Sequence, residues 1–372
     1  MMRDILLVVL DATRADHFLC DLPGATTYVN AYATACWTPP SAAAIMTGYA
    51  PHIARLRLEQ EAGVLTLTEQ LMAAGWRCEA SRQLPSPRET GGAEVWDDLS
   101  IKDDDGMAER AMAIMAERGE RRFVTLWMMG CHCPYDRFDK AARRRFRLNA
   151  DWTVREVVRR GDTPMEGGDQ PDYMPAIPDV TIEEVQYIRL MYAATAFCVC
   201  RRVERLWRAA LDAGWNIIIT ADHGEALYEH GTLGHMHVWE ENVRVPLAAS
   251  IEGLSPGPVE ALASHLDIAP TILALAGLEY QLPGYDLRAL PEERQLCWQR
   301  GAWGMLPWRF GGVAKRGAGL TSCWTDESGI VPDASAAVNH YARLVMDVGA
   351  PEEQETRRQL EALGYVTSTT SG

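Results

Sequence analysis

The sequence lacks three features that would each assign it to a class of protein: a long apolar run, an excess of positive charge, and a repeated or low-complexity tract. Its longest nearly unbroken apolar stretch, residues 190–200, is far shorter than the roughly 20 residues of a membrane-spanning helix, so no such helix is predicted. The 36 Lys and Arg residues face 51 Asp and Glu residues, giving a formal charge of −15. An acidic surface repels phosphate backbones, so nucleic-acid binding is not expected.

A cleavable leader is not expected either. The first apolar run, residues 5–10, is too short for the apolar region of a signal peptide and ends on Asp11 instead of a small-residue cleavage site. We interpret it as a buried strand and expect a cytoplasmic protein. The nine cysteines are scattered, and the Cys-x-Cys pairs at 131/133 and 198/200 lack the spacing of a zinc knuckle, so we expect reduced thiols.

Three continuous apolar runs, residues 5–10, 123–129 and 216–220, indicate strands buried on both faces, which is typical of a parallel sheet. Helical stretches such as 65–74 alternate with them. The pattern predicts an α/β fold with a mostly parallel central sheet sandwiched by helices. Ligands collect at the carboxyl ends of such strands, where Asp11, His132 and Asp222 stand.

We divide the 372 residues into a catalytic domain, 1–280, and a small C-terminal α+β subdomain, 281–372, packed on it. Within the first, residues 136–181 are polar and contain Gly and Pro, which indicates an insertion or lid. The insertion contains an arginine cluster, comprising Arg143, Arg144, Arg145, Arg147, Arg155, Arg159 and Arg160. The cluster is either a basic cover over an anionic substrate or a solvated helix face.

Polar residues suited to metal binding stand at two strand ends and at one helix start. Asp11 closes the first run, and Asp222-His223 closes the third on a turn that suits a divalent cation. Thr38 precedes two prolines and a small-residue helix, which the Ser41 hydroxyl is expected to cap. The dipole and free N–H groups of a helix N-terminus favour an anion or a developing alkoxide at Thr38.

These segments resemble the alkaline phosphatase superfamily, and within it the sulfatase-like branch of phosphodiesterases, phosphonate monoester hydrolases and phosphotransferases. ILLVVLDATRADH is similar to the opening of that branch, and TPPSAAAIMTG matches its nucleophile motif, C/S/T-x-P-S-x-x-x-x-x-T-G. Later blocks match in the same order: TADHGEALYEHGTLGH, WEENVRVPL, SHLDIAPTILALAGL and LEALGYV. The resemblance spans nearly the whole chain and implies an alkaline-phosphatase-like fold.

Carried over by position, the resemblance implies that Asp11, Thr38, Asp222 and His223 surround one divalent metal ion, which could be Mn, Zn, Ca or Mg. Thr38 would be both ligand and nucleophile. The chemistry agrees, because a cation lowers the pKa of a threonine hydroxyl and neutralises a nonbridging oxygen of the substrate.

The resemblance also implies catalytic roles for His132 and His235, either in binding substrate oxygens or in protonating the leaving group. His237 competes with His235, because the local alignment needs a one-residue gap. Tyr135, in the same H-x-P-Y block as His132, is a further candidate for substrate binding.

Departures from the family pattern bear on the substrate. Sulfatases oxidise a cysteine or serine to formylglycine, which Thr38 cannot give, and Ala42 stands where their motif has an arginine. Cys36 lies two residues upstream of the nucleophile position and does not replace it. We therefore predict that a small anionic phosphate or phosphonate ester is hydrolysed or transferred through a covalent phospho-threonine.

Three alternatives remain open. A two-metal phosphomonoesterase or mutase would need more ligands, for which His265, Asp267 and His235 are the candidates. We expect one metal, because in the one-metal branch this block is a helix start that Asp267 caps. The others are a sulfuric ester hydrolase and a noncatalytic, degenerate family member. Retention of all four metal-site residues argues against degeneracy, and the oligomeric state stays open.

Overall fold

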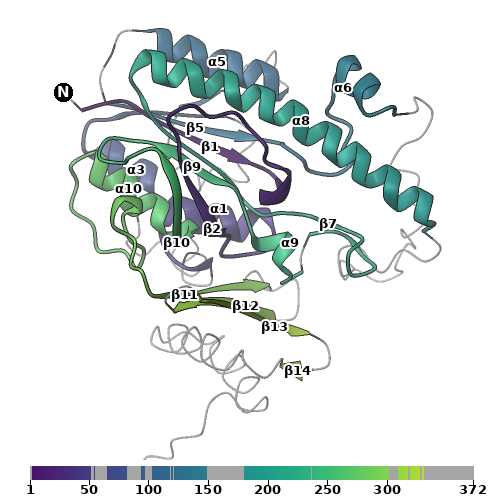
Figure 1. The fold of residues 1–372 in the computed structure, drawn as a ribbon. Helices are drawn as coiled ribbons and strands as arrows, with labels where there is room; N and C mark the ends of the chain where they lie inside the picture. The colour runs from purple at the N-terminus through teal and green to yellow at the C-terminus, as the bar shows by residue number, and fades with distance from the viewer. Residues whose placement is uncertain are drawn as a thin grey trace, which may run out of the picture.

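The computed structural model describes residues 2–51, 54, 65–81, 94–96, 103–117, 119, 121–148, 180–235, 237–300, 309–316, 319–326 and 329–330. An eight-stranded sheet forms the centre of the molecule, with helices on both faces (Figure 1). Its strands lie in the order β10 (Gly257–Ser264), β2 (Thr26–Tyr32), β9 (Leu247–Ser250), β6 (Asn216–Ala221), β1 (Ile5–Leu10), β5 (Arg122–Met128), β3 (Arg77–Ser81) and β4 (Glu94–Trp96). Strand β9 is antiparallel to both neighbours, and the other described pairs in this sheet are parallel. The predicted fold class is confirmed.

The three apolar runs form the middle of this sheet. Strands β1, β5 and β6 are buried along their whole length, as expected for strands covered on both faces. In the register of the sheet, Leu10 at the end of β1 pairs with Met128 of β5 and with Ala221 of β6. The carboxyl ends of the three strands are therefore level, and the segments that follow them start from one edge.

Helices α5 (Asp104–Ala116) and α8 (Ile182–Ala213) cover one face of the sheet, and α1 (Thr38–Thr47), α3 (Leu67–Ala73) and α10 (Ile268–Leu275) cover the other (Figure 1). The 32-residue helix α8 begins at a capping box, in which the Thr181 side chain accepts from the Glu184 amide and Glu184 from the Thr181 amide. It ends at Gly214, whose φ of +72° favours glycine. The predicted helix 65–74 is α3, which has a capping box of its own.

A second, antiparallel sheet follows, made of β11 (Arg294–Arg300), β12 (Arg309–Arg316), β13 (Gly319–Asp326) and β14 (Gly329–Ile330). Its first strand contacts the main sheet, because the Gln299 amide donates to the Thr34 carbonyl at 3.0 Å and Trp298 stacks on Tyr32. Apart from a short 3-10 helix at Leu287–Ala289, the regular structure in the described part of the predicted C-terminal subdomain is β. Its helical part and the boundary at residue 280 stay predictions, since residues 331–372 lie outside the described residues.

The predicted insertion, 136–181, is described at residues 136–148 and 180–181. It contains α6 (Lys140–Arg145), which packs on α8, with the Arg145 guanidinium 4.9 Å from the centre of the Phe197 ring. The arginines at 155, 159 and 160 lie outside the described residues, so the lid stays a prediction.

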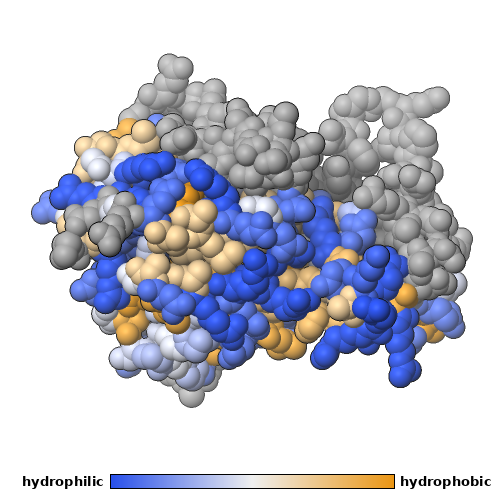
Figure 2. Space-filling model, turned by 90° about the horizontal axis from the view of Figure 1, so that it is seen from above, coloured by the Kyte–Doolittle hydropathy of each residue, from blue (hydrophilic) through white to orange (hydrophobic). Residues whose placement is uncertain are grey.

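Seen from above α5 and α8, the surface carries mostly hydrophilic residues with hydrophobic patches between them (Figure 2). Ion pairs such as Arg202 with Asp105 join the two helices on this side. Within the described ranges, none of the helices combines the length and apolar character needed to cross a membrane.

Candidate active site

The four predicted metal-site residues come from three segments and meet at the carboxyl edge of the central sheet. Asp11 follows β1, and Asp222 and His223 follow β6, the adjacent parallel strand. Thr38 is the first residue of α1. The structure thus brings together residues from distant parts of the sequence.

The four side chains surround one small volume. The Thr38 Oγ1 atom lies 3.2 Å from Nε2 of His223. The same nitrogen lies 3.7 Å from Oδ1 of Asp11 and 3.5 Å from Oδ2 of Asp222. One ligand atom from each of Asp11, Asp222 and His223 lies within 4.8 Å of the other two, which is a spacing that a single cation can bridge.

The hydrogen bonds around these residues orient them toward that volume. The His223 Nδ1 atom lies 2.7 Å from the Gly224 carbonyl, which can only accept, so Nδ1 carries the proton and Nε2 keeps its lone pair. The Asp222 Oδ1 atom accepts from the amides of Ala12 and His223. By contrast, Oδ1 of Asp11 and Oδ2 of Asp222 are buried and accept no hydrogen bond from any part of the chain that the structure describes. Such orphaned buried oxygens need a partner, and a divalent cation fits them.

The pKa shifts of these residues also indicate that the site lacks a positive charge. Burial raises the pKa of Asp11 well above its usual range, and the neighbouring carboxylates of Asp222 and Glu225 raise it further. Burial raises the pKa of Asp222 to about 7. Burial and then His235 lower the pKa of His223 well below its ordinary value, so its ring is neutral, the form that binds metals. Burial without a counter-charge therefore disfavours the ionised form of both carboxylates, and a positive charge between them would offset that cost.

A second group of polar side chains adjoins the first. The ring of His235 lies 4.5 Å from the ring of His223 and 5.4 Å from that of His132, measured between centroids. The Glu225 Oε2 atom lies 2.9 Å from His235 Nδ1, and Glu225 Oε1 accepts from the Tyr135 hydroxyl at 2.6 Å. The predicted residues His132, His235 and Tyr135 are therefore close together, and Glu225 connects two of them.

The two histidines of this group differ in their electrostatic surroundings. Burial disfavours the charged ring of His235, but the Glu225 carboxylate outweighs burial and raises the pKa of His235. Burial and then the nearby His235 lower the pKa of His132. A pair of groups with pKa values moved in opposite directions suits proton transfer at an active site.

Two of the candidate substrate-binding residues are engaged elsewhere. His237 stacks on Trp239, with ring centroids 4.2 Å apart, so the geometry favours His235 as the histidine of the site. Tyr135 is fully buried and its hydroxyl is directed to Glu225. The sequence analysis does not single out Glu225. The only indication in the sequence is that Glu225 is an acidic residue two positions after the predicted ligand His223.

The candidates for a second metal are also engaged. The His265 ring donates from Nε2 to the Ala221 carbonyl and accepts at Nδ1 from the Thr34 amide. Asp267 accepts from the Ser264 amide and from the Arg294 guanidinium at 2.6 and 2.7 Å. Asp267 therefore caps a helix start.

Helix α1 corrects one detail of the prediction. The helix begins at Thr38, so Ser41 lies inside its first turn and its hydroxyl donates back to the Ala35 carbonyl instead of capping. Pro39 and Pro40 fill the first turn and have no N–H groups, so the helix start offers the Thr38 amide alone where several free amides were expected.

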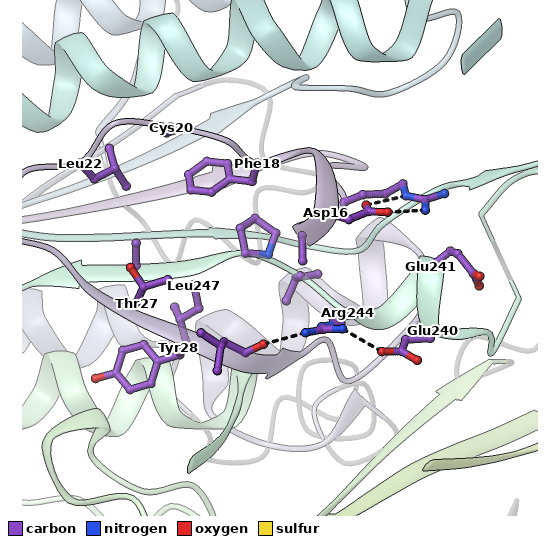
Figure 3. A pocket seen from close by; sticks show the side chains of 16 residues that line it. Asp16, Phe18, Cys20, Leu22, Thr27, Tyr28, Glu240, Glu241, Arg244 and Leu247 are labelled. Atoms are coloured by element: carbon purple, nitrogen blue, oxygen red, sulfur yellow. Dashed lines mark hydrogen bonds and ion pairs between the residues drawn. The ribbon is translucent and has the colours of Figure 1, made fainter. Parts of the chain in front are cut away.

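A groove of about 620 Å³ lies beside the site, and none of the predicted site residues lines it. Its wall includes Arg14, whose guanidinium donates to the Glu225 carbonyl, and Arg244, which reaches toward Glu240 (Figure 3). Neither of the candidate metal groups found among the described residues lies in this groove, so we assign the candidate active site to the Thr38 cluster.

Comparisons with known proteins identify the family. A model of the Sulfatase family matches residues 7–278. The choline-sulfatase of Rhizobium meliloti is 33% identical over 107 residues, which cover 28% of this chain and 21% of that protein. The arylsulfatase K of Homo sapiens is 38% identical over 80 residues, 21% of this chain and 15% of that protein. The chain thus matches about a fifth or less of the length of these curated relatives.

Solved structures share the fold. The phosphonate monoester hydrolase from Silicibacter pomeroyi has a TM-score of 0.59 and 17% identity, covering 96% of this chain and 95% of that one. A putative sulfatase from Bacteroides thetaiotaomicron has a TM-score of 0.64 and 16% identity, covering 97% and 94%. Since the family model spans well over half of the chain, this protein belongs to the Sulfatase family, in the sulfatase-like branch of the alkaline phosphatase superfamily.

Proposed function

We propose that this chain is a metal-dependent hydrolase, or transferase, of a small phosphate or phosphonate ester, and that Thr38 carries the transferred group as a covalent phospho-threonine. The observation that carries the proposal is the Thr38 hydroxyl, 3.2 Å from His223 Nε2 beside two buried carboxylates. Thr38 is half-buried, whereas Asp11, Asp222 and His223 are buried. A substrate therefore reaches the hydroxyl more readily than the groups behind it.

Asp11, Asp222 and His223 would hold one divalent cation, with Thr38 Oγ1 as a further ligand. Such a cation, when bound, lowers the pKa of the hydroxyl and neutralises charge on the substrate. Two carboxylates, a hydroxyl and an imidazole suit Mg, Ca, Mn and Zn, so the identity of the metal is a matter for experiment.

The reaction then has two steps. The Thr38 oxygen attacks phosphorus and gives up its proton, the bond to the leaving group breaks, and the leaving alcohol gains a proton. Water, or the hydroxyl of an acceptor, then attacks phosphorus and gives up a proton. The bond between phosphorus and the Thr38 oxygen breaks, that oxygen regains a proton, and the phosphorus product is released. His132 and His235 lie beside the cluster, where they bind substrate oxygens or protonate the leaving group.

Sulfate ester hydrolysis is the second candidate, because the curated relatives that match include a choline-sulfatase and an arylsulfatase. Thr38 argues against it, since the formylglycine of sulfatases derives from cysteine or serine. A two-metal phosphomonoesterase or mutase is less well supported, because His265 and Asp267 already bond to other groups.

The test is a panel of 4-nitrophenyl esters, comprising a phosphate monoester, a phosphate diester, a phosphonate monoester and a sulfate, each assayed with Mn, Zn, Mg and Ca. We expect turnover of a phosphorus ester, and loss of at least about a thousandfold in Thr38→Ala, the scale seen when a nucleophile is removed. Sulfate hydrolysis alone, or full activity of the folded Thr38→Ala variant, would overturn the proposal. If the metal-loaded protein hydrolyses none of the esters, the result favours the noncatalytic alternative.

A further inference from the structure

We propose that Glu225 is a positioning residue of the active site: it orients the ring of His235 by accepting from Nδ1, and it is itself fixed by the Tyr135 hydroxyl. The inference rests on the proposed function, since it assigns a residue to that reaction. It is carried by the geometry of three side chains, Tyr135, Glu225 and His235, none of which belongs to the predicted set of Asp11, Thr38, Asp222 and His223. His235 is a candidate ligand for a second metal, and ligand atoms of His223, Glu225 and His235 lie within 4.8 Å of one another, so the test below includes metal content.

A short hairpin brings Glu225 and His235 together. Strands β7 (Ala226–Leu227) and β8 (Leu233–Gly234) pair with Ala226 opposite Gly234. Glu225 directly precedes β7 and His235 directly follows β8, so the register places these two residues opposite each other. Their contact is therefore set by the backbone, and the 2.9 Å distance between Oε2 and Nδ1 follows from it.

The hairpin itself is held at two points. Arg189 of α8 donates from Nε to the Leu227 carbonyl at 2.9 Å. Glu229, in the turn of the hairpin, accepts from the Leu227 amide and pairs with Arg14 at 2.6 Å. With both the strand and the turn fixed, the base of the hairpin keeps Glu225 and His235 in place.

The Glu225 carboxylate is fully buried and both of its oxygens are in use. Oε1 accepts from the Tyr135 hydroxyl at 2.6 Å, and Oε2 is bonded to His235. Tyr135 is also fully buried, and its carbonyl accepts from the Thr195 hydroxyl of α8 at 2.8 Å. A buried carboxylate whose two oxygens each have a partner is well suited to orient a side chain, and less suited to bind a substrate.

The consequence concerns the ring of His235. A carboxylate only accepts, so Nδ1 carries a proton, and Nε2 is the ring nitrogen left for a substrate oxygen or a leaving group. The His235 ring lies between those of His223 and His132, at 4.5 and 5.4 Å. A carboxylate behind a histidine fixes its tautomer and direction in many enzymes, and losing such a partner costs about 10- to 100-fold in activity.

Glu225→Gln is the informative change, because glutamine has the same shape but one acceptor oxygen. Its amide oxygen can accept from Tyr135 or from His235 Nδ1, and its NH₂ group then donates to the other partner. The Tyr135 hydroxyl can turn to accept from that group, whereas His235 Nδ1 can accept only in the other tautomer. In either arrangement the negative charge behind the His235 ring is lost, and in the second the tautomer is reversed. Glu79→Gln is the matched control, with the same substitution at another buried glutamate, which lies on β3 outside the hairpin and pairs with Arg77 and Arg110.

The experiment is a double-mutant cycle of Glu225→Gln and His235→Ala, measured as kcat/KM of the metal-loaded protein on the best ester of the panel. We expect each single change to lower kcat/KM, Glu225→Gln by about 10- to 100-fold, and the double variant to match His235→Ala alone within about twofold. Glu79→Gln should stay within about threefold of the unaltered chain. Tyr135→Phe should lower activity less than Glu225→Gln, since it leaves the carboxylate.

Two further measurements separate positioning from folding. Metal content and the midpoint of thermal unfolding should be nearly unchanged in Glu225→Gln. The ¹⁵N resonances of the His235 ring should report a proton on Nδ1 in the unaltered chain and a changed distribution in the variant. Multiplicative losses in the double variant, loss of metal from Glu225→Gln, or an unmoved His235 signal would each overturn the inference. If His235→Ala itself has full activity, the role given to His235 in the proposed function fails instead.

Discussion

Replacing Asp222 by asparagine should stabilise the metal-free protein, although it removes a predicted metal ligand. In the absence of a cation, two buried carboxylates lie beside His223 with one oxygen each left unbonded by the described residues. Asparagine keeps the carbonyl oxygen that accepts from the amides of Ala12 and His223. Its NH₂ group replaces the second oxygen and can donate toward the Asp11 carboxylate.

The magnitude follows from the pKa of Asp222, which burial raises from 3.8 to about 7. At about 1.4 kcal/mol per pKa unit, this difference corresponds to roughly 4 kcal/mol. The sign follows from proton binding: between these two values the native state binds the proton more tightly than the unfolded chain, so stability falls as the pH rises. The full loss of unfolding free energy is reached above about pH 7, and there is no loss below pH 3.8. Metal-free Asp222→Asn should therefore be more stable than the unaltered protein at pH 8, by up to about 4 kcal/mol, and the gap should narrow toward pH 4.

The assay is urea unfolding of EDTA-treated protein at pH 8 and pH 5, repeated with saturating Mn²⁺. A cation at 100 times its dissociation constant adds about 2.7 kcal/mol to a protein that binds it, so Mn²⁺ should stabilise the unaltered chain and have little effect on Asp222→Asn. Asp267→Asn is the control. Asp267 is equally buried but is paired with Arg294, so its substitution should cost about 3–5 kcal/mol with or without metal.

Two results would refute this reasoning. If metal-free Asp222→Asn is no more stable than the unaltered chain at pH 8, burial does not disfavour the Asp222 carboxylate as its raised pKa implies. If Mn²⁺ stabilises both proteins equally, Asp222 is not a ligand.

Two other changes probe the surroundings of the site. In Gly224→Ala the new Cβ would lie 2.0 Å from the Glu241 carbonyl oxygen, so the turn that carries His223 must move. We expect a loss of about 1–3 kcal/mol in unfolding free energy and weaker Mn²⁺ binding, measured by urea unfolding and calorimetric titration. Reversing the charges at 143–145 to Glu should raise KM for an anionic ester several-fold if this segment covers the substrate. An unchanged KM supports a solvated helix face, which agrees with the packing of Arg145 on Phe197.

The parts of the fold that could be predicted are those where the need to bury apolar side chains allows one arrangement only. A continuous apolar run must be covered on both faces, and the run at 216–220 became β6 with its bounds shifted by one residue. Because parallel strands end at one edge, the meeting of Asp11 with Asp222 follows from the strands alone. Helix α1 shows the limit of local rules: Ser41 suits a cap, but prolines fit the first turn of a helix, and the residue at the cap position is Trp37, four residues earlier.

Glu225 could not be predicted in the same way, because its contacts depend on a register and not on a strand end. Ten residues separate Glu225 from His235, and that spacing has no fixed meaning until β7 and β8 pair with Ala226 opposite Gly234. Its other partner, Tyr135, is 90 residues away and enters from the segment after β5. Strand ends therefore determine where the predicted cation and nucleophile meet, whereas the hairpin and the segment after β5 determine how the histidines around them are oriented. We therefore expect changes in the second set of contacts to alter the activity on an ester while leaving Thr38, the predicted nucleophile, in place.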